Sequence, residues 1–376
     1  MTKVCLTAAT AYHTAMHRYP VLIIDDKGLF CPAAGVHIDP WRPVDRAVIT
    51  HAHSDHARAG HGHYLATPGT VAVMRQRLGP IQAQTLAFDT PLRVGGAMIS
   101  LHPAGHVPGS AQVRVEVGGE VWVVSGDYKT EADGLAEPFT PVRCHTFISE
   151  CTFGLPVFRW QPQARIIGDI LVWWQAAADQ GRAALIGAYA LGKAQRILAA
   201  LPDGPGPILT HGAVEDTNAT LRAAGYALPA PARATGGKAP AGALILAPPA
   251  ALGSPWARRL GPHDSALASG WMALRGVRRR RNLAIGFTLS DHADWDGLNT
   301  AIRATGATRV LVTHGYTAAF RRWLHEQGYD AHVLSTEYSG ETLDAAPDDP
   351  AGQNAEHAPG PDPETAPRPP GPRGPA

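Results

Sequence analysis

Apolar residues in the first 150 positions alternate with polar ones over short runs, which is typical of β-strands. The runs are separated by clusters of Gly, Pro, Asp and Ser, the residues that favour turns. A Gly-Gly pair at 118–119 fits a tight hairpin between two of the runs. We expect strands at Val21–Asp25, Gly35–Asp39, Arg46–Thr50, Met98–His102, Gln112–Val117 and Glu120–Ser125.

The middle of the chain changes to helical spacing between short buried runs. Helices are expected at Ile166–Gln180 and Lys193–Ala200, and strands at Ala184–Ala188, Pro207–Thr210 and Ala243–Ala247. This alternation predicts a parallel α/β unit. Later elements are a strand at Leu283–Leu289, a helix at Leu298–Thr305 and a strand at Arg309–Thr313.

Composition indicates which parts of the chain are ordered and which classes of protein are excluded. Residues 344–376 hold 10 of the chain's 33 prolines and almost no large apolar residue, so they are expected to be a disordered tail, and 1–17 an unstructured extension. With 33 Lys+Arg against 32 Asp+Glu, the chain is not a generally basic coat for nucleic acid. The four scattered cysteines contain no CxxC pair and favour a reduced, cytoplasmic setting, and no apolar run predicts a membrane span.

Histidine changes the picture, because the 18 histidines are unevenly spread. The segment HAHSDH follows the strand Arg46–Thr50, so that His51 and His53 can point the same way. Asp55 and His56 are expected to open the next helix and to face a second point nearby. Imidazole and carboxylate together suit Zn²⁺, and a carboxylate can bridge two ions.

Further ligand types follow other predicted strands. Three of them, each just past a strand end, are His106, Asp127 and His314. Asp39 also ends a strand, where it would either orient a ligand histidine or cap a turn. Strand ends gather at one edge of a sheet, so the repeated pattern of strand then ligand predicts one metal site.

The residues Asp39, HAHSDH at 51–56, His106 and Asp127 resemble the metallo-β-lactamase fold superfamily in order and spacing. The resemblance implies a four-layer αββα sandwich with two zinc ions per chain. On that pattern His51, His53 and His106 hold the first zinc and Asp55, His56 and His314 the second, while Asp127 bridges both.

Glu150 in ISECTFG, His292 in LSDHADW and His314 in VTHG resemble the three motifs of the β-CASP nucleases. The resemblance implies a lactamase domain at 18–158 and 283–343, interrupted by an inserted β-CASP α/β domain at 159–282. The stretches YALGKAQ, THG and ASGWMALRGVRRRR look most like the bacterial ligase-associated DNA exonucleases. That group implies DNA repair beside an ATP-dependent DNA ligase and a large helicase.

Residue roles follow as hypotheses. His292 would protonate the leaving oxygen, Glu150 would fix its tautomer, and Asp55 would be catalytic as well as a ligand; alternatively, Ser290 and Asp291 cap a helix and His292 is a spectator. Lys193 and Gln195 would line the cleft or lie on a helix surface. Nucleic acid would contact Ser269, Gly270, Arg275, Arg278, Arg279, Arg280 and Arg281, with Trp271 stacking nearby, unless these form a solvated loop.

Three other functions come into question. A non-catalytic scaffold in a repair complex is disfavoured, because β-CASP relatives of that kind usually lose metal ligands and every ligand position is filled here. β-CASP enzymes that act on DNA in eukaryotes tend to carry valine where this chain has His314, so an RNA-processing ribonuclease is the alternative. A small-molecule metallohydrolase would share the HxHxDH loop but would need neither the inserted domain nor the late histidines.

Overall fold

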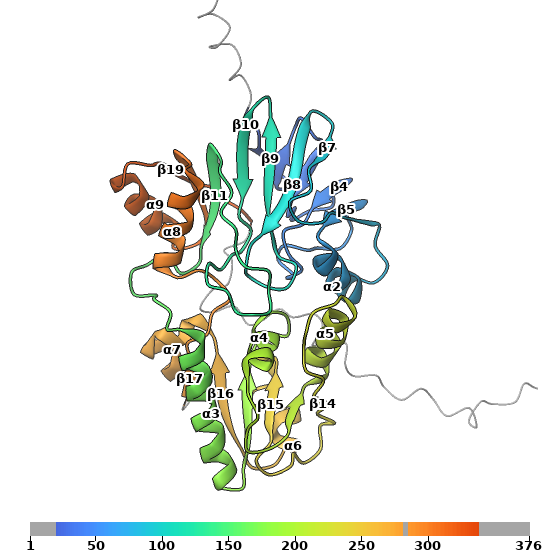
Figure 1. The fold of residues 1–376 in the computed structure, drawn as a ribbon, viewed down its shortest axis with the longest axis vertical. Helices are drawn as coiled ribbons and strands as arrows, with labels where there is room; N and C mark the ends of the chain where they lie inside the picture. The colour runs from blue at the N-terminus through green and yellow to red at the C-terminus, as the bar shows by residue number, and fades with distance from the viewer. Residues whose placement is uncertain (1–19, 281–284, 338–376) are drawn as a thin grey trace, which may run out of the picture.

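The computed structural model describes residues 20–280 and 285–337, which form two lobes (Figure 1). The upper lobe in that view contains the first and last parts of the described chain, and the lower lobe contains the middle part. The predicted extension 1–17 and tail 344–376 lie outside the described residues. Within the described ranges, no helix is both long and apolar enough to cross a bilayer.

Two sheets and three helices form the upper lobe. The first sheet runs β1 to β6 in order, with bounds Ile23–Ile24, Leu29–Cys31, Val36–Ile38, Arg46–Val48, His63–Ala66 and Ala83–Thr85. The second has the order β19-β18-β11-β10-β9-β8-β7, with bounds Asp330–Val333, Arg309–Gly315, Thr146–Cys151, Glu120–Val124, Ala111–Val117, Ala97–Pro103 and Leu92–Val94. The helices are α2 (Pro68–Leu78), α8 (Trp295–Thr305) and α9 (Thr317–Glu326).

The two sheets pack face to face through a shared apolar core. It includes Ile38 and Val48 of the first sheet and Leu101 and Ile148 of the second. Helix α2 packs on the outer face of the first sheet, and α8 and α9 on that of the second. Successive side chains of a strand point to opposite faces, so Ile148 joins the shared core while Phe147 packs towards the helices. Both faces of β11 are covered, and this is why all six of its residues are buried, the polar ones included.

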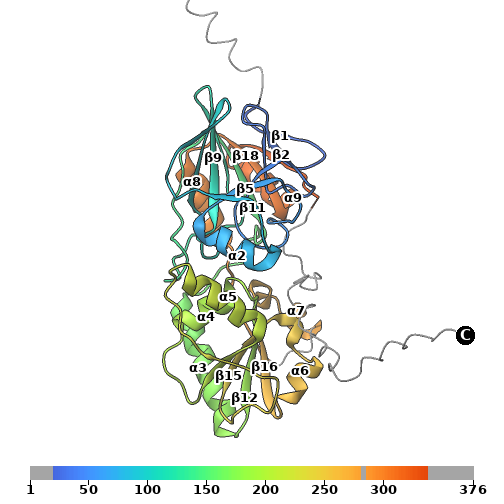
Figure 2. The same ribbon diagram turned by 90° about the vertical axis from the view of Figure 1, so that its right-hand side faces the viewer.

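The lower lobe is built on a third sheet, fully parallel, in the order β14-β13-β15-β12-β16-β17. Its strands are Ala232–Arg233, Ile208–Thr210, Leu244–Ala247, Ala183–Gly187, His263–Ala268 and Ile285–Phe287. Its helices are α3 (Gln163–Asp179), α4 (Lys193–Ala200), α5 (Gly212–Ala223), α6 (Pro255–Arg259) and α7 (Arg275–Arg280), with short 3-10 helices η1 (Pro249–Ala251) and η2 (Gly270–Ala273). Parallel strands end at one edge, and the loop after β12 reaches the upper lobe, where Leu191 joins the core under α2. Figure 2 shows α5 lying against α2 at this boundary.

The α/β class predicted from the sequence is confirmed, and the expected elements are present with ends shifted by up to three residues. Two local expectations are wrong. Asp55 and His56 do not open a helix: Ala57 N donates to His53 O at 2.8 Å in a single turn, and Gly60, in the left-handed region, then returns the chain to β5. His314 lies inside β18 instead of after it, because β11 continues to pair with this strand as far as Gly315.

Candidate metal centre

The loop after β4 leaves the sheet edge beside the end of β10, and small residues let the two approach. Gly126 has φ +57, and a Cβ on it would lie 2.7 Å from Thr50 Cβ, so only glycine fits between β4 and β10 here. Asp127 is the next residue. The close contact therefore places the Asp127 carboxylate against the histidines that follow Thr50.

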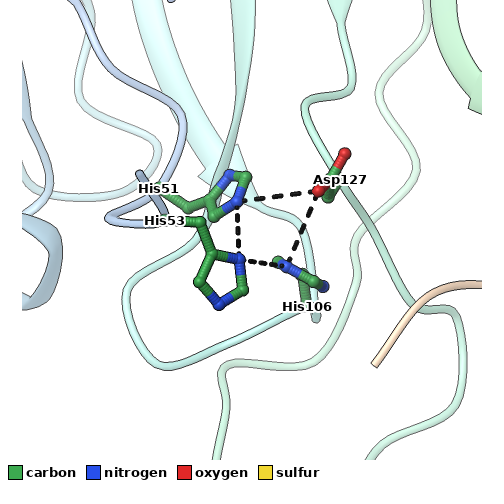
Figure 3. Close-up of side chains that lie close together, drawn as sticks. All are labelled: His51, His53, His106 and Asp127. Atoms are coloured by element: carbon green, nitrogen blue, oxygen red, sulfur yellow. Dashed lines mark hydrogen bonds and ion pairs between the residues drawn. The ribbon is translucent and has the colours of Figure 1, made fainter. Parts of the chain in front are cut away.

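Figure 3 shows four side chains from three loops pointing towards one another. His53 Nδ1 lies 3.0 Å from His51 Nε2 and 3.1 Å from His106 Nε2. Asp127 Oδ2 lies 3.7 Å from His51 Nε2 and 3.8 Å from His106 Nε2. We call His51, His53, His106 and Asp127 the first ligand group, since one atom from each can reach a common point.

The far nitrogens of these rings have fixed partners. His53 Nε2 lies 3.2 Å from Leu191 O, and His106 Nδ1 lies 2.7 Å from Asp291 O. Carbonyl oxygens only accept, so both nitrogens carry the proton and the nitrogens facing the group, His53 Nδ1 and His106 Nε2, carry lone pairs. Two lone pairs 3.1 Å apart repel unless a positive charge lies among them. The donor set therefore fits a cation.

A second ligand group, His56, Asp127 and His314, adjoins the first. Asp127 Oδ2 lies 3.5 Å from His56 Nε2, and its Oδ1 lies 3.7 Å from His314 Nδ1. His56 Nε2, Asp127 Oδ1 and His314 Nδ1 are all buried with no hydrogen-bond partner in the protein. Buried polar atoms without a partner are costly, so three converging on one point also fit a cation.

The backbone is strained at two residues of this centre. Among the described residues, Asp39, Asp89 and His314 are the non-glycine residues with positive φ, at +44°, +58° and +55°. Asp39 Oδ1 accepts from Thr50 N at 2.8 Å, and its Oδ2 lies 2.8 Å from His56 Nδ1. Asp39 thus makes the contact that orienting His56 requires, leaving Nε2 for the group. Strain of this kind persists where surrounding contacts over-determine the conformation.

Burial and neighbouring charges set the protonation of the ligands. Burial, together with the other histidines, holds the pKa values of His51 and His106 well below their usual range, so both rings are neutral, the form that binds a metal ion. Burial alone would lower the pKa of His56, but the Asp127 and Asp55 carboxylates raise it well above the usual range. Burial would raise the pKa of Asp127, but His56 and His292 hold it well below. His56 is therefore protonated in the absence of a metal ion, and its positive charge lies at the position that a cation would take in the second ligand group.

Asp55 lies beside the second ligand group without joining it. Its Oδ2 is 3.7 Å from His56 Nε2, and the side chain is partly exposed. Asp55, His56, His314 and Trp41 are among the residues that line a pocket of about 60 Å³. The apolar part of its lining is Leu29, Ile38, Val124, Ile148 and Leu334. The second ligand group is therefore the one that faces this pocket.

Glu150 and His292 meet next to both groups, although they are 142 residues apart. Glu150 Oε1 lies 2.8 Å from His292 Nδ1, and both side chains are buried. The carboxylate also accepts from Tyr128 N at 3.0 Å and from Thr152 N at 3.2 Å, so its position is fixed. One atom each of Asp127, Glu150 and His292 could also hold an ion. The geometry is compatible with His292 as a proton donor and with His292 as a ligand.

The predicted nucleic-acid residues are placed unevenly. Ser269 Oγ accepts from Trp271 N at 3.3 Å, and a Cβ on Gly270 would lie 2.5 Å from the Phe153 ring. Trp271 is buried against Phe153, with ring centroids 4.8 Å apart. The structure therefore does not present these three residues to a nucleic acid, since they cap η2 and pack in the core. Arg275 is exposed. Outside the described side chains lie Arg278, Arg279, Arg280 and Arg281.

Sequence reasoning missed the residues that hold the ligand rings. Leu191 and Asp291 act through backbone carbonyls, which every residue type has, so composition carries no signal for them. Lys193 and Gln195 neither line a cleft nor lie on a helix surface; both are buried. The sequence did contain one indication of their role. Lys193 and Arg196 are spaced i, i+3, which places two positively charged side chains on one face of a helix.

No family model matches the chain. It is 33% identical over 311 residues to a protein of Opitutus terrae named probable DNA ligase, which covers 82% of this chain and 30% of the relative. It is 31% identical over 188 residues to ribonuclease TTHA0252 of Thermus thermophilus, which covers 43% of each chain. Endoribonuclease YSH1 of Yarrowia lipolytica is 33% identical over 127 residues, or 32% of this chain and 14% of the relative. The chain thus spans less than half the length of these curated relatives.

Among solved structures, a protein of unknown function from Enterococcus faecalis has a TM-score of 0.54 over 79% of this chain and 80% of that chain, at 12% identity. That likeness concerns the fold alone. Two of the curated relatives carry the names ribonuclease and endoribonuclease. The chain therefore belongs to the β-CASP family of the metallo-β-lactamase fold.

Proposed function

We propose that the chain is a two-zinc phosphodiesterase that degrades DNA as an exonuclease during repair, in association with an ATP-dependent DNA ligase. The observation that carries the proposal is the convergence of the two ligand groups on Asp127, with the Glu150–His292 pair beside them. Two cations bridged by one carboxylate are a recurring arrangement in enzymes that cleave phosphodiesters. Imidazole and carboxylate donors favour zinc.

In the proposed architecture, 18–158 and 283–343 form an αββα metallo-β-lactamase domain, and 159–282 is the inserted β-CASP domain. We extend the insert to include β17 (Ile285–Phe287), because this strand pairs with β16 in the sheet of the lower lobe. The parallel pairing of β11 with β18 supports this division, because a late segment completes a sheet begun before the insert. The contact of His53 with Leu191, a residue of the insert, explains why the insert would matter for chemistry.

In the proposed reaction each residue has a separate task. His51, His53 and His106 would hold one cation, His56, His314 and Asp55 the other, and Asp127 both. When bound, the cations would offset charge on the phosphoryl oxygens and lower the pKa of a bound water to about 7. His292, held through Nδ1–H by Glu150 and protonated on both ring nitrogens, would give its Nε2 proton to the leaving sugar oxygen and be left as neutral imidazole. The products would carry a 5′-phosphate and a 3′-hydroxyl.

The ligase association rests on one relative. Most of this chain resembles part of a polypeptide named probable DNA ligase. Activities carried on one chain in one organism often act in succession, so we propose that a ligase uses the ends this enzyme prepares. The association with a large helicase rests on the motif resemblance alone. Free thiols at Cys31, Cys144 and Cys151 are consistent with the proposed cytoplasmic setting.

RNA is the second candidate substrate. Two relatives carry the names ribonuclease and endoribonuclease, and the last motif of this chain has His314. Their likeness to this chain covers less than half of it, whereas that of the ligase-named protein covers 82%. We therefore rank DNA first.

The test uses purified, zinc-loaded protein with single-stranded DNA, duplex DNA and RNA of one sequence, each labelled in turn at the 5′ and the 3′ end. We expect progressive shortening of DNA from one end, and RNA degraded at least about tenfold more slowly. Degradation of RNA alone would establish the ribonuclease alternative. Hydrolysis of a thioester or a β-lactam without attack on any nucleic acid would refute the nuclease proposal.

A further inference from the structure

A buried ion-pair cluster joins the start of α4 in the lower lobe to the loop before α8 in the upper lobe. Asp291 Oδ2 lies 3.3 Å from Lys193 Nζ, and Oδ1 lies 3.5 Å from Arg196 Nη1. The side chains are 2%, 3% and 7% exposed for Asp291, Lys193 and Arg196. Buried charges in such a cluster are screened little, and removal of one partner leaves the others uncompensated.

Further contacts hold the cluster in one geometry. Arg196 Nη1 donates to Ser290 O, and its Nε donates to Gln163 Oε1 at 2.6 Å. Lys193 Nζ lies 4.5 Å from the centroid of the Tyr189 ring. Gly192 permits the close approach: it has φ +93, and a Cβ on it would lie 2.4 Å from Val107 Cγ1. The start of α4 therefore packs directly on the Asp291 loop.

The same loop reaches the candidate metal centre through its backbone. Asp291 O accepts from His106 Nδ1 at 2.7 Å, and the next residue, His292, pairs with Glu150. Asp291 thus has its carboxylate held by α4 and its carbonyl held on a ligand ring. Both groups belong to one residue, so releasing the carboxylate removes a contact that holds the backbone of this loop, and with it the carbonyl, in place. Partners of this kind set the orientation and basicity of ligand histidines.

We propose that Lys193 and Arg196 are positioning residues, which fix Asp291 so that its carbonyl aims the His106 ring into the first ligand group. The inference rests on the proposed function for its effect on turnover, but its effect on metal affinity is independent of the substrate. A purely structural role, in which the cluster only ties the lobes together, would instead lower stability and leave metal affinity unchanged.

The test compares Asp291→Asn and Lys193→Met with the wild-type chain. Zinc affinity is measured by competition with a chromophoric chelator, and thermal unfolding is followed on the metal-free protein. Each variant should bind zinc about 10- to 100-fold more weakly, the size of effect known for partners of ligand residues. Arg182→Met is the control, because the Arg182–Asp264 pair, at 2.7 Å in the same lobe, touches no candidate ligand. Its zinc affinity should stay at the wild-type value.

Two further variants separate positioning from folding. Lys193→Arg keeps the charge and should recover most of the affinity lost in Lys193→Met, whereas the double variant Lys193→Met/Asp291→Asn should bind zinc no more weakly than the worse single one. If Asp291→Asn does not fold, Lys193→Met and Arg196→Lys carry the comparison. Folded variants with zinc affinity within twofold of the wild type would overturn the inference. A wild-type chain inactive on all nucleic acids would refute the proposed function while the chelator titration still decided this one.

Discussion

The two ligand groups share Asp127 but are supported differently. In the first group the far nitrogens of His53 and His106 have carbonyl partners, and these come from two different segments of the chain. In the second group His56 is held by Asp39, but His314 reaches the group from a backbone at φ +55°. Protein contacts thus orient two rings of the first group, whereas the second group has three buried polar atoms without a hydrogen-bond partner.

The difference indicates a division of labour. A site whose ligands are aimed before the ion arrives needs no reorganisation, so the first group should bind its cation more tightly. The second group faces the pocket lined by Asp55 and Trp41. A cation there would be more accessible to substrate and to exchange. The comparison therefore predicts that the two groups bind cations with unequal affinity, and that the second group, which faces the pocket, binds its cation more weakly.

Replacing the shared carboxylate should have the largest effect. Asp127→Ala removes the one residue common to both groups, so both cations should be lost and turnover should fall about 10⁴-fold or more, since the cations supply several kcal/mol to the transition state. Turnover of end-labelled DNA and bound zinc are the measurements. Asp330→Asn, a change of an exposed carboxylate paired with Arg309, is the control. Full zinc content in Asp127→Ala would show that the groups do not share it.

His292→Ala comes next and separates the ligands from the Glu150–His292 pair. If His292 supplies a proton, zinc content should stay at the wild-type value while turnover falls about 10²- to 10⁴-fold. Metal analysis and single-turnover rates on one preparation test this. Zinc loss equal to that of Asp127→Ala would assign His292 as a ligand, as its nearness to Asp127 also allows.

His314→Ala and His53→Ala test the inequality of the sites directly. His314→Ala should lose one zinc equivalent and retain the other. His53→Ala should weaken the tighter site, and a chelator titration should show it as loss of the high-affinity phase. Equal titration curves for the two variants would remove the distinction between the groups.

His61 is a buried histidine outside both groups and should give the smallest effect. Burial, with a contribution from His37, lowers its pKa to about 4. Because the unfolded chain takes up the proton first, this residue should destabilise the fold as pH falls from about 6.5 to about 4, by at most about 3 kcal/mol. Denaturant midpoints across this range should vary less in His61→Gln than in the wild type. His63→Gln, at an exposed position, should follow the wild-type curve.

The ligand pattern could be predicted from the sequence because the constraint is local. The candidates His51, His106, Asp127 and His314 lie within three residues of a strand end. Strand ends converge, so their order along the chain already implied one cluster. The sequence around Trp271 predicted contact with nucleic acid, but the structure buries these residues. An indole and a glycine pack in a core as readily as they bind a ligand. The burial of Trp271 against Phe153 depends on a residue about 120 positions away. No local pattern reports such a contact.

The orienting contacts could not be predicted for a related reason. The Asp291 carbonyl meets His106 across 185 residues, and a carbonyl has no residue type to mark it. Such carbonyl contacts become visible only when the folded arrangement of distant segments is known. The clustering of the candidate ligands can therefore be predicted from the sequence, whereas the carbonyl contacts that orient His53 and His106 require the structure.

The most direct test of the two-cation centre is the metal content of purified protein, determined by elemental analysis after dialysis against chelator-treated buffer with limiting zinc. Two equivalents per chain, released in two phases of unequal affinity, are expected. A single equivalent, or none, in a folded preparation would contradict the account.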